Sequence, residues 1–226
     1  MHSPTQKQYG DLQQAYALFN DALFGGSLPE CLITMQRQSH TYGYFAGERF
    51  GATDGSGHVD EIALNPAHFK DRSTEEVLST LVHEMTHLWQ HHFGQRRSQR
   101  AYHNKEWAAK MEAVGLAPSA TGEPGGKKTG QRVSHYIEAG GAFAVACARL
   151  VEQGFVVPYA DEWEEGGAAK TKRKKKAASK TKYTCASCGL NVWGKPEIKV
   201  VCGACMAMIG VTEQRYGKFH RDFWGF

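Results

Sequence analysis

Two groups of residues have the types and spacing of metal ligands. The first is His83-Glu84-Met85-Thr86-His87, in which two histidines lie four residues apart. On a helix such histidines share one face, one turn apart, and their imidazoles can bind one zinc ion together. Glu84 would then lie beside a zinc-bound water, from which its carboxylate can take a proton. The pattern predicts a catalytic zinc centre with His83 and His87 as ligands and Glu84 as general base.

Four cysteines near the end of the chain form the second group. They follow the pattern C-x2-C-x13-C-x2-C, and they are Cys185, Cys188, Cys202 and Cys205. Two such turns bring four thiolates to one zinc ion, and a site closed by four thiolates has no open position for chemistry. We therefore expect a structural zinc ion in a zinc ribbon, with a redox-active pair as the alternative. The isolated Cys31 and Cys147 are interpreted as ordinary buried residues.

The histidine motif requires a helix, and the residues around it have the pattern of one. From Ser73 to His92 the apolar residues recur at the spacing of a helix that is buried on one side. Ser73 followed three residues later by Glu76 is a capping-box signature for its start, and Gly94 fits its end. The alternative is an amphipathic helix that carries histidines on its solvated face and binds no metal.

A catalytic zinc ion usually takes three protein ligands, and the third is not given by the helix alone. The metzincin pattern requires a histidine where this chain has Phe93, so that class is excluded. His91 lies one turn further along the same helix and would be too far along its axis to complete a tetrahedron. The residues alone leave three candidates on later segments, which are His103, Glu106 and His135.

The segment before the metal helix has the pattern of a helix followed by a small sheet. A helix is expected over residues 5–24, and strands are expected over 32–36, 41–46 and 59–64. The edge strand of such a sheet could bind an extended polypeptide through main-chain hydrogen bonds. We therefore interpret the sheet as a possible substrate-binding element beside the metal helix.

The segments after the metal helix are expected to be mainly helical. Asn104 can cap a helix over residues 105–114, and another helix is expected within residues 134–153. Residues 119–132 between them are rich in Gly and Lys, and they are expected to be mobile. No role in the site is predicted for this part of the chain from its pattern.

The basic charge is concentrated in one connecting segment. Residues 1–165 contain 14 Lys and Arg against 20 Asp and Glu, whereas residues 166–182 contain 8 basic and no acidic residues. The low complexity of this segment predicts a disordered linker. Its clustered cations could bind the phosphates of DNA without sequence preference. The predicted DNA contacts are Lys170, Lys172, Arg173, Lys174, Lys175 and Lys176, together with the adjoining ribbon.

The histidine motif and the sequence His103-Asn104-Lys105-Glu106-Trp107 together resemble the SprT-like (Spartan-type) metalloprotease domain. That family has its third zinc histidine shortly before an acidic and aromatic pair. The resemblance therefore implies that His103 is the third ligand and that Glu106 lies outside the ligand set. His135 could contact the site, but we interpret it as a solvated or core-edge residue. The resemblance covers most of residues 9–117 and, because the family often carries a zinc ribbon, residues 183–209.

The resemblance implies an α+β chain with two zinc ions, one catalytic and one structural. The first domain, over residues 5–165, is expected to be a zincin-like protease domain with helices and a small mainly antiparallel sheet. It is expected to be followed by a basic linker over 166–182, a four-cysteine zinc ribbon over 183–210 and a tail over 211–226. The implied activity is that of a zinc-dependent endopeptidase on DNA-associated or DNA-crosslinked proteins. No association with a membrane is expected, because the longest apolar run of the sequence is too short to span a bilayer.

Two other functions are compatible with the same motifs. One is a DNA-binding accessory protein with a structural or inactive zinc site, and the other is a non-proteolytic zinc hydrolase. Glu84 favours an enzyme, because a purely structural site does not need that carboxylate. The polar first residues lack the apolar core of a signal peptide, so we expect an intracellular location, in the cytoplasm or nucleoid, or in the nucleus of a eukaryote.

Overall fold

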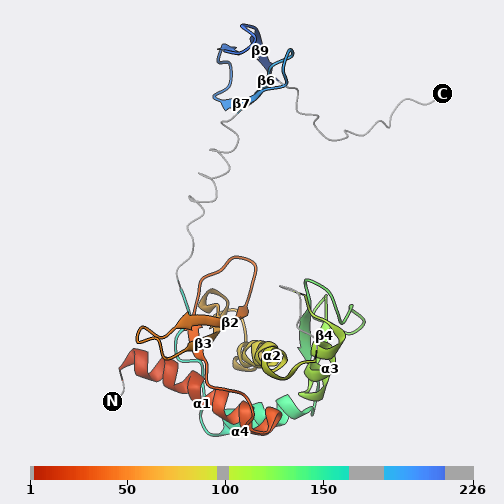
Figure 1. The fold of residues 1–226 in the computed structure, drawn as a ribbon. Coiled ribbons are helices and arrows are strands. Elements are labelled where there is room, and N and C mark those ends of the chain that lie inside the picture. The colour runs from red at the N-terminus through yellow and green to blue at the C-terminus, as the bar shows by residue number, and fades with distance from the viewer. Residues whose placement is uncertain (1–2, 96–101, 163–180, 212–226) are drawn as a thin grey trace, which may run out of the picture. The chain divides into compact units, whose positions relative to one another are not determined.

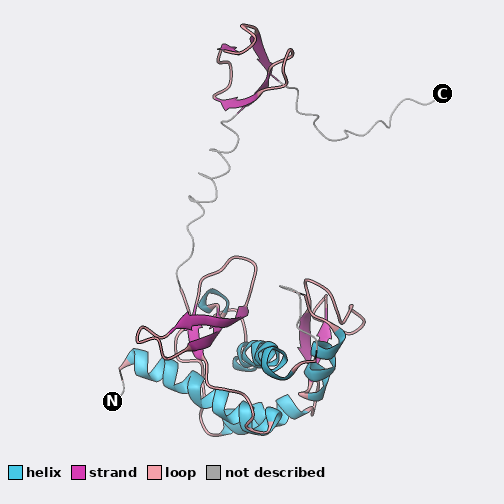
Figure 2. Cartoon of the chain, in the orientation of Figure 1, coloured by secondary structure: helices cyan, strands magenta, loops and turns pink. Residues whose placement is uncertain are grey.

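The computed structural model describes residues 3–95, 102–162 and 181–211 of the 226-residue chain (Figure 1). The chain divides into two compact units, Met1–Trp163 and Glu164–Phe226. Helices and small sheets are combined in the described part of the first unit (Figure 2), and this confirms the α+β class. None of the described helices is both long enough and apolar enough to cross a bilayer.

The first sheet has three strands in the order β1-β3-β2, with β3 in the centre. The strands are β1 (Leu32–Met35), β2 (Gly43–Gly51) and β3 (His58–Leu64). β1 is parallel to β3 and β2 is antiparallel to it, so the sheet is mixed. β2 is longer than the strand expected over 41–46, because a bulge between Ala46 and Phe50 lets pairing with β3 resume. Glu48 in this bulge has a positive φ of 51°.

Helices α1 (Pro4–Phe24) and α2 (Thr74–Phe93) begin at the capping residues that their sequences provide. The hydroxyl of Ser73 accepts a hydrogen bond from the Glu76 N–H at 3.1 Å, and the Glu76 carboxylate accepts from the Ser73 N–H at 2.8 Å. This confirms the predicted capping box. Helix α2 lies centrally in its unit, with β2 and β3 on one side and α3 on the other (Figure 1).

The apolar face of α2 is buried in one core that α1 and α4 complete. Leu78, Leu81, Val82 and Met85 of α2 are fully buried there. Phe19 of α1 stacks on Phe143 of α4 with 5.4 Å between ring centroids. Side chains of this size lose most of their water contact on burial, and each such burial contributes about 1.5–3 kcal/mol to folding. The core therefore fixes the orientation of the helix that carries the histidine motif.

Beyond α2 the chain forms two helices and a strand pair. The elements are α3 (Lys105–Ala113), β4 (Leu116–Ser119), β5 (Ser134–Ile137) and α4 (Ala142–Glu152). Asn104 caps α3 as predicted, since its side chain accepts a hydrogen bond from the Trp107 N–H. The antiparallel pairing of β4 with β5 was not predicted, because each strand has only four residues and β4 contains Pro118. The mobility of residues 119–132 stays a prediction.

The described part of the second unit is a four-stranded antiparallel sheet in the order β7-β6-β9-β8. Its strands are β6 (Thr181–Thr184), β7 (Asn191–Gly194), β8 (Val200–Val201) and β9 (Met208–Val211). Its small core consists of Tyr183, Cys185, Cys202 and Ile209. The cations predicted to contact DNA, Lys170 to Lys176, and the tail after Val211 lie outside the described residues.

Candidate metal centre

Three imidazoles converge beside α2. His83 and His87 come from the helix, and His103 comes from the segment just before α3. One ligand nitrogen from each ring lies within 4.8 Å of the other two. The pairwise distances between ring centroids are 5.2, 5.4 and 4.8 Å. The structure thus brings together the three histidines that sequence and resemblance suggested as one ligand set.

His103 is held in place by main-chain pairing with Gly130. The N–H of each residue donates to the carbonyl of the other, at 2.8 and 3.0 Å. The imidazole Nδ1 of His103 also lies 3.1 Å from the Gly130 carbonyl oxygen, which can only accept a hydrogen bond. Nδ1 must therefore carry the proton, and the Nε2 lone pair is left available for a metal.

His135 contacts the metal centre, an alternative that the sequence interpretation considered but did not favour. Its Nδ1 lies 3.0 Å from Nδ1 of His83, and its Nε2 lies 2.8 Å from the Ser79 hydroxyl. That hydroxyl donates to the Glu76 carbonyl at 2.8 Å, so it accepts from His135. His135 then accepts the proton of His83 Nδ1, which leaves Nε2 of His83 for a metal.

His135 is half-buried, and of the two alternatives that the sequence left open it has the contact with the site. His135 is not in the ligand group. It reaches His83 because β5 pairs with β4, and that pairing joins residues far apart in the chain. Its only sequence signal was its residue type.

Burial keeps the histidines of this centre neutral. It lowers the pKa of His83 well below its usual value, and the neighbouring imidazoles of His135, His87 and His103 lower it further. It also lowers the pKa of His87 to about 3 and the pKa of His135 to about 4. The pKa of His103 is lowered as well, again mainly by burial. Neutral imidazoles with free lone pairs are the form that binds zinc, so the donor set fits that metal.

Glu84 is a residue of α2, and its side chain faces β2. Its side chain is buried, and burial raises the pKa of its carboxyl to about 8. The backbone N–H of Phe45 on β2 donates a hydrogen bond to the carboxylate, which offsets part of this rise in pKa. The strand can approach α2 because Gly43 has no side chain: an added Cβ would lie 3.0 Å from Cγ2 of Thr80 and 3.4 Å from Cγ of Glu84. Glu84 therefore has the raised proton affinity and the fixed orientation of a general base.

Trp107 of α3 packs against all three histidines of the centre. Its ring centroid lies 4.9, 5.1 and 4.3 Å from the rings of His83, His87 and His103. The indole is fully buried, and its Nε1 has no hydrogen-bond partner among the described residues. Glu106 beside it accepts a hydrogen bond from the Gln95 N–H at 2.7 Å. The one sequence signal for Trp107 was its place in the motif that begins at His103.

The model of the SprT-like family matches residues 12–128, which is more than half of the chain. The chain belongs to the SprT-like family. The matched range includes His83, Glu84, His87 and His103, and it ends before β5 and the cysteines. This family is associated with metalloproteases, so membership supports a function of that type for the histidine centre.

A curated relative of this SprT-like protein comes from Salmonella typhimurium and is described as "uncharacterized protein in mucB 3'region". It is 49% identical over 59 residues, which make up 26% of this chain and 80% of the relative. No solved structure matches the chain.

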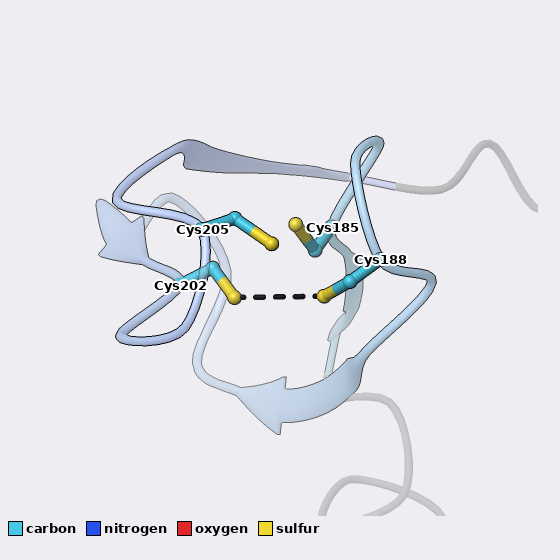
Figure 3. Close-up of side chains that lie close together, drawn as sticks. All are labelled: Cys185, Cys188, Cys202 and Cys205. Carbon is cyan, nitrogen blue, oxygen red and sulfur yellow. Dashed lines mark hydrogen bonds between the residues drawn. The ribbon is translucent and has the colours of Figure 1, made fainter.

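The second candidate metal site of the SprT-like protein is formed by its four late cysteines. Their sulfurs point toward one another from two turns (Figure 3), and all lie within 4.8 Å of one another. The sulfurs of Cys188 and Cys202 are 3.7 Å apart. The first turn is closed by the Gly189 N–H donating to the Cys185 carbonyl at 2.9 Å, and the second by the Met206 N–H donating to the Cys202 carbonyl at 2.7 Å.

The environment of the sulfurs suits a divalent cation. Backbone N–H groups of Cys188 and Ser187 lower the pKa of the Cys185 thiol to about 7. By contrast, a hydrogen bond to Cys188, together with burial and the neighbouring sulfurs, raises the pKa of the Cys205 thiol to about 12. Four thiolates this close repel one another, and a bound cation would remove that repulsion. The four-sulfur group therefore fits a closed zinc site.

Proposed function

We propose that this SprT-like protein is a zinc-dependent endopeptidase. His83, His87 and His103 would hold the catalytic zinc ion, and Glu84 would act as general base. The observation that carries the proposal is the convergence of three neutral imidazoles beside a buried carboxylate that is oriented by the Phe45 N–H. The proposal includes a zincin-like fold for the first unit, because the metal helix runs beside an edge strand of a sheet.

The chemistry divides between the metal and the residues around it. When bound, zinc supplies a Lewis acid that polarises the scissile carbonyl and makes water more acidic. Glu84 takes the proton of the attacking water and later returns it to the departing amine. In the metal-free chain, burial raises the pKa of this carboxyl. His135 and Gly130 hold two of the imidazoles in the tautomer that leaves Nε2 free.

The strand β2 is the proposed binding element for the substrate backbone. It is an edge strand, because β3 is its only partner among the described strands. The Phe45 N–H donates to Glu84, so at Phe45 the outer edge of β2 faces the metal centre. An extended peptide could add to this edge by main-chain pairing and present a bond to Glu84. A peptide inhibitor that binds away from β2 in a co-crystal would contradict this part of the proposal.

Proteins bound or crosslinked to DNA are the proposed substrates. The 8 basic residues of 166–182 support this, since clustered cations bind phosphates. The proposed zinc ribbon, residues 183–210, has an exposed Trp193 with the Lys182 ammonium 6.0 Å from its ring centre. An exposed indole beside a cation is suited to stack on a nucleic-acid base. Replacing the lysines of 170–176 by glutamine should reduce the salt dependence of DNA affinity, and an unchanged slope would contradict the linker's role.

Cleavage of a loosely folded, DNA-binding protein would test the proposed enzyme. The zinc-loaded chain is incubated with it alone, with single-stranded DNA and with double-stranded DNA. Glu84→Gln should retain its zinc and lose cleavage by about 10²–10⁴-fold, the usual contribution of a general base. Glu75→Gln, at an exposed position of α2, is the matched control. Full cleavage by Glu84→Gln would refute the assignment, and DNA binding without cleavage by the unaltered chain would favour the accessory protein.

A further inference from the structure

A third group of potential metal ligands lies outside the two sites described above. It consists of Asp60 on β3 and of His91 and His92 in the last turn of α2. One ligand atom from each residue lies within 4.8 Å of the other two. None of these residues has a role in the proposed proteolysis. The group therefore requires its own explanation.

Asp60 is anchored at both of its carboxylate oxygens. The side chain is buried; Oδ1 accepts a hydrogen bond from the Glu48 N–H at 2.7 Å, and Oδ2 lies 2.6 Å from Nε2 of His92. The Glu48 N–H is available because Glu48 lies in the bulge of β2 with a positive φ of 51°. A carboxylate that is oriented by a backbone donor is the form in which Asp usually binds a metal.

His91 is held against β2 by close packing. A Cβ added at Gly47 would lie only 2.7 Å from Cε1 and 2.9 Å from Nε2 of His91, so the ring occupies space that a side chain at position 47 would need. The Phe45 ring lies 5.6 Å from the His91 ring, centroid to centroid. These contacts hold the imidazole near Asp60, and among the described residues no hydrogen bond to the His91 ring is found.

We propose that Asp60, His91 and His92 form a third binding site for a divalent transition metal ion of the zinc type. Two imidazoles and one carboxylate are a ligand set that zinc commonly takes. A hydrogen bond between Asp60 and His92 accounts for those two residues, and the third member, His91, is held beside them by packing against β2. The His92 side chain is 35% exposed, which gives the ion access and leaves room for water in a fourth position.

Binding of the ion requires His92 to move away from Asp60. Two ligands of a tetrahedral zinc ion, each about 2.0–2.1 Å from the metal, lie about 3.3 Å apart. Nε2 of His92 and Oδ2 of Asp60 must therefore separate from 2.6 Å, with the ring proton released to solvent. A partly exposed side chain such as His92 can make this movement by rotation, whereas Asp60 stays anchored by the Glu48 N–H.

The ion would join the last turn of α2 to the sheet. Asp60 connects it to the β2 bulge through the Glu48 N–H, and the same strand donates the Phe45 N–H to Glu84. The site is thus built to stabilise the strand beside the histidine centre. It does not depend on the proposed proteolysis, because none of its three residues belongs to that centre.

Zinc binding to the full chain would test the inference. Equilibrium dialysis at set free zinc concentrations, followed by elemental analysis, should give three zinc ions per chain and two in His92→Ala. The affinity of the third ion should fall at least about tenfold in His92→Ala and in Asp60→Asn, which keeps an acceptor for the Glu48 N–H. His40→Asn is the matched control, since His40 is exposed and outside the group, and Asn tolerates its positive φ of 66°.

Two further readouts separate the site from chance binding. Zinc should shift the imidazole NMR signals of His91 and His92 together, and it should raise the unfolding temperature of the unaltered chain more than that of His92→Ala. A third ion bound equally well by His92→Ala, or lost equally in His40→Asn, would overturn the inference. So would imidazole signals of His91 and His92 that do not shift at about 100 μM free zinc, because a specific site with a dissociation constant in the micromolar range would be filled at that concentration.

Discussion

Replacing His135 by Phe should weaken zinc binding at the histidine centre. The substitution keeps an aromatic ring on β5 but removes the acceptor for His83 Nδ1 and the donor to the Ser79 hydroxyl. Loss of a group that orients a metal-binding histidine typically costs about 10–100-fold in metal affinity. That range corresponds to about 1.4–2.8 kcal/mol of binding free energy. We expect the larger value, because the unpaired Nδ1–H of His83 would be left in a buried site.

Chelator competition followed by imidazole NMR signals would measure this effect without interference from the cysteines. His135→Gln is the rescue variant, because its amide can accept from His83 and donate to Ser79, and it should recover most of the affinity. Tyr136→Phe, the neighbouring position on β5, is the control. The free energy of unfolding of the zinc-free proteins should be compared as well. If His135 had only a structural role, His135→Phe would change this free energy, and His135→Gln would not restore the zinc affinity. Zinc affinity of His135→Phe within twofold of the unaltered chain would refute the reasoning.

Three further predictions concern Glu84, Gly43 of β2 and the four-cysteine site. Burial raises the pKa of Glu84 to about 8, so its carboxyl destabilises the zinc-free fold as pH rises from its unfolded value of about 4.5. Zinc-free Glu84→Gln should therefore be more stable than the unaltered chain at pH 8, by on the order of 3–5 kcal/mol, with the difference vanishing near pH 4; urea unfolding at both pH values would measure it. Gly43→Ala should destabilise the first unit by about 1–3 kcal/mol and reduce peptide cleavage, because the new methyl meets the Ala63 carbonyl oxygen; unfolding and activity assays on the same preparation would detect it, and an unchanged stability would contradict the close approach. Cys202→Ser should lower the zinc content by one ion and abolish the ordered NMR signals of residues 181–211, while the signals of His83 and His87 keep their zinc dependence; loss of both ions would contradict two separate sites.

The histidine centre also has an expected response to acid in the metal-free protein. The pKa of His87 is lowered to about 3 and that of His135 to about 4, so the unfolded chain takes up protons first as pH falls below about 6.5. Each histidine whose pKa is lowered by folding contributes stability above its pKa in the unfolded chain. This stability is lost as the pH falls toward its pKa in the folded chain. Circular dichroism of zinc-free Glu84→Gln between pH 7 and 4 should show this loss, because that variant lacks the carboxyl whose protonation stabilises the fold over the same range. A stability of this variant that is unchanged over that range would contradict the lowered pKa values of the two histidines.

The sequence alone determined those features that depend on neighbours along one element. The spacing of His83 and His87 places both on one face of α2, and the Ser73 and Glu76 pair marks its start, because helical geometry relates residues three and four apart. The two cysteine turns follow from the same local logic, since each turn closes within five residues. These features were predictable because their partners are close in the chain.

Tertiary structure alone decided the contacts that complete the centre. His83 meets His135 across 52 positions, and Glu84 meets the Phe45 N–H across the gap between a helix and a strand. His92 likewise reaches Asp60 across 32 positions. Periodicity shows which face of an element is buried, but it does not show which element covers that face. Two ligands of the metal could therefore be proposed from the spacing and the third from the family resemblance, whereas the residues that orient those ligands required the packed fold.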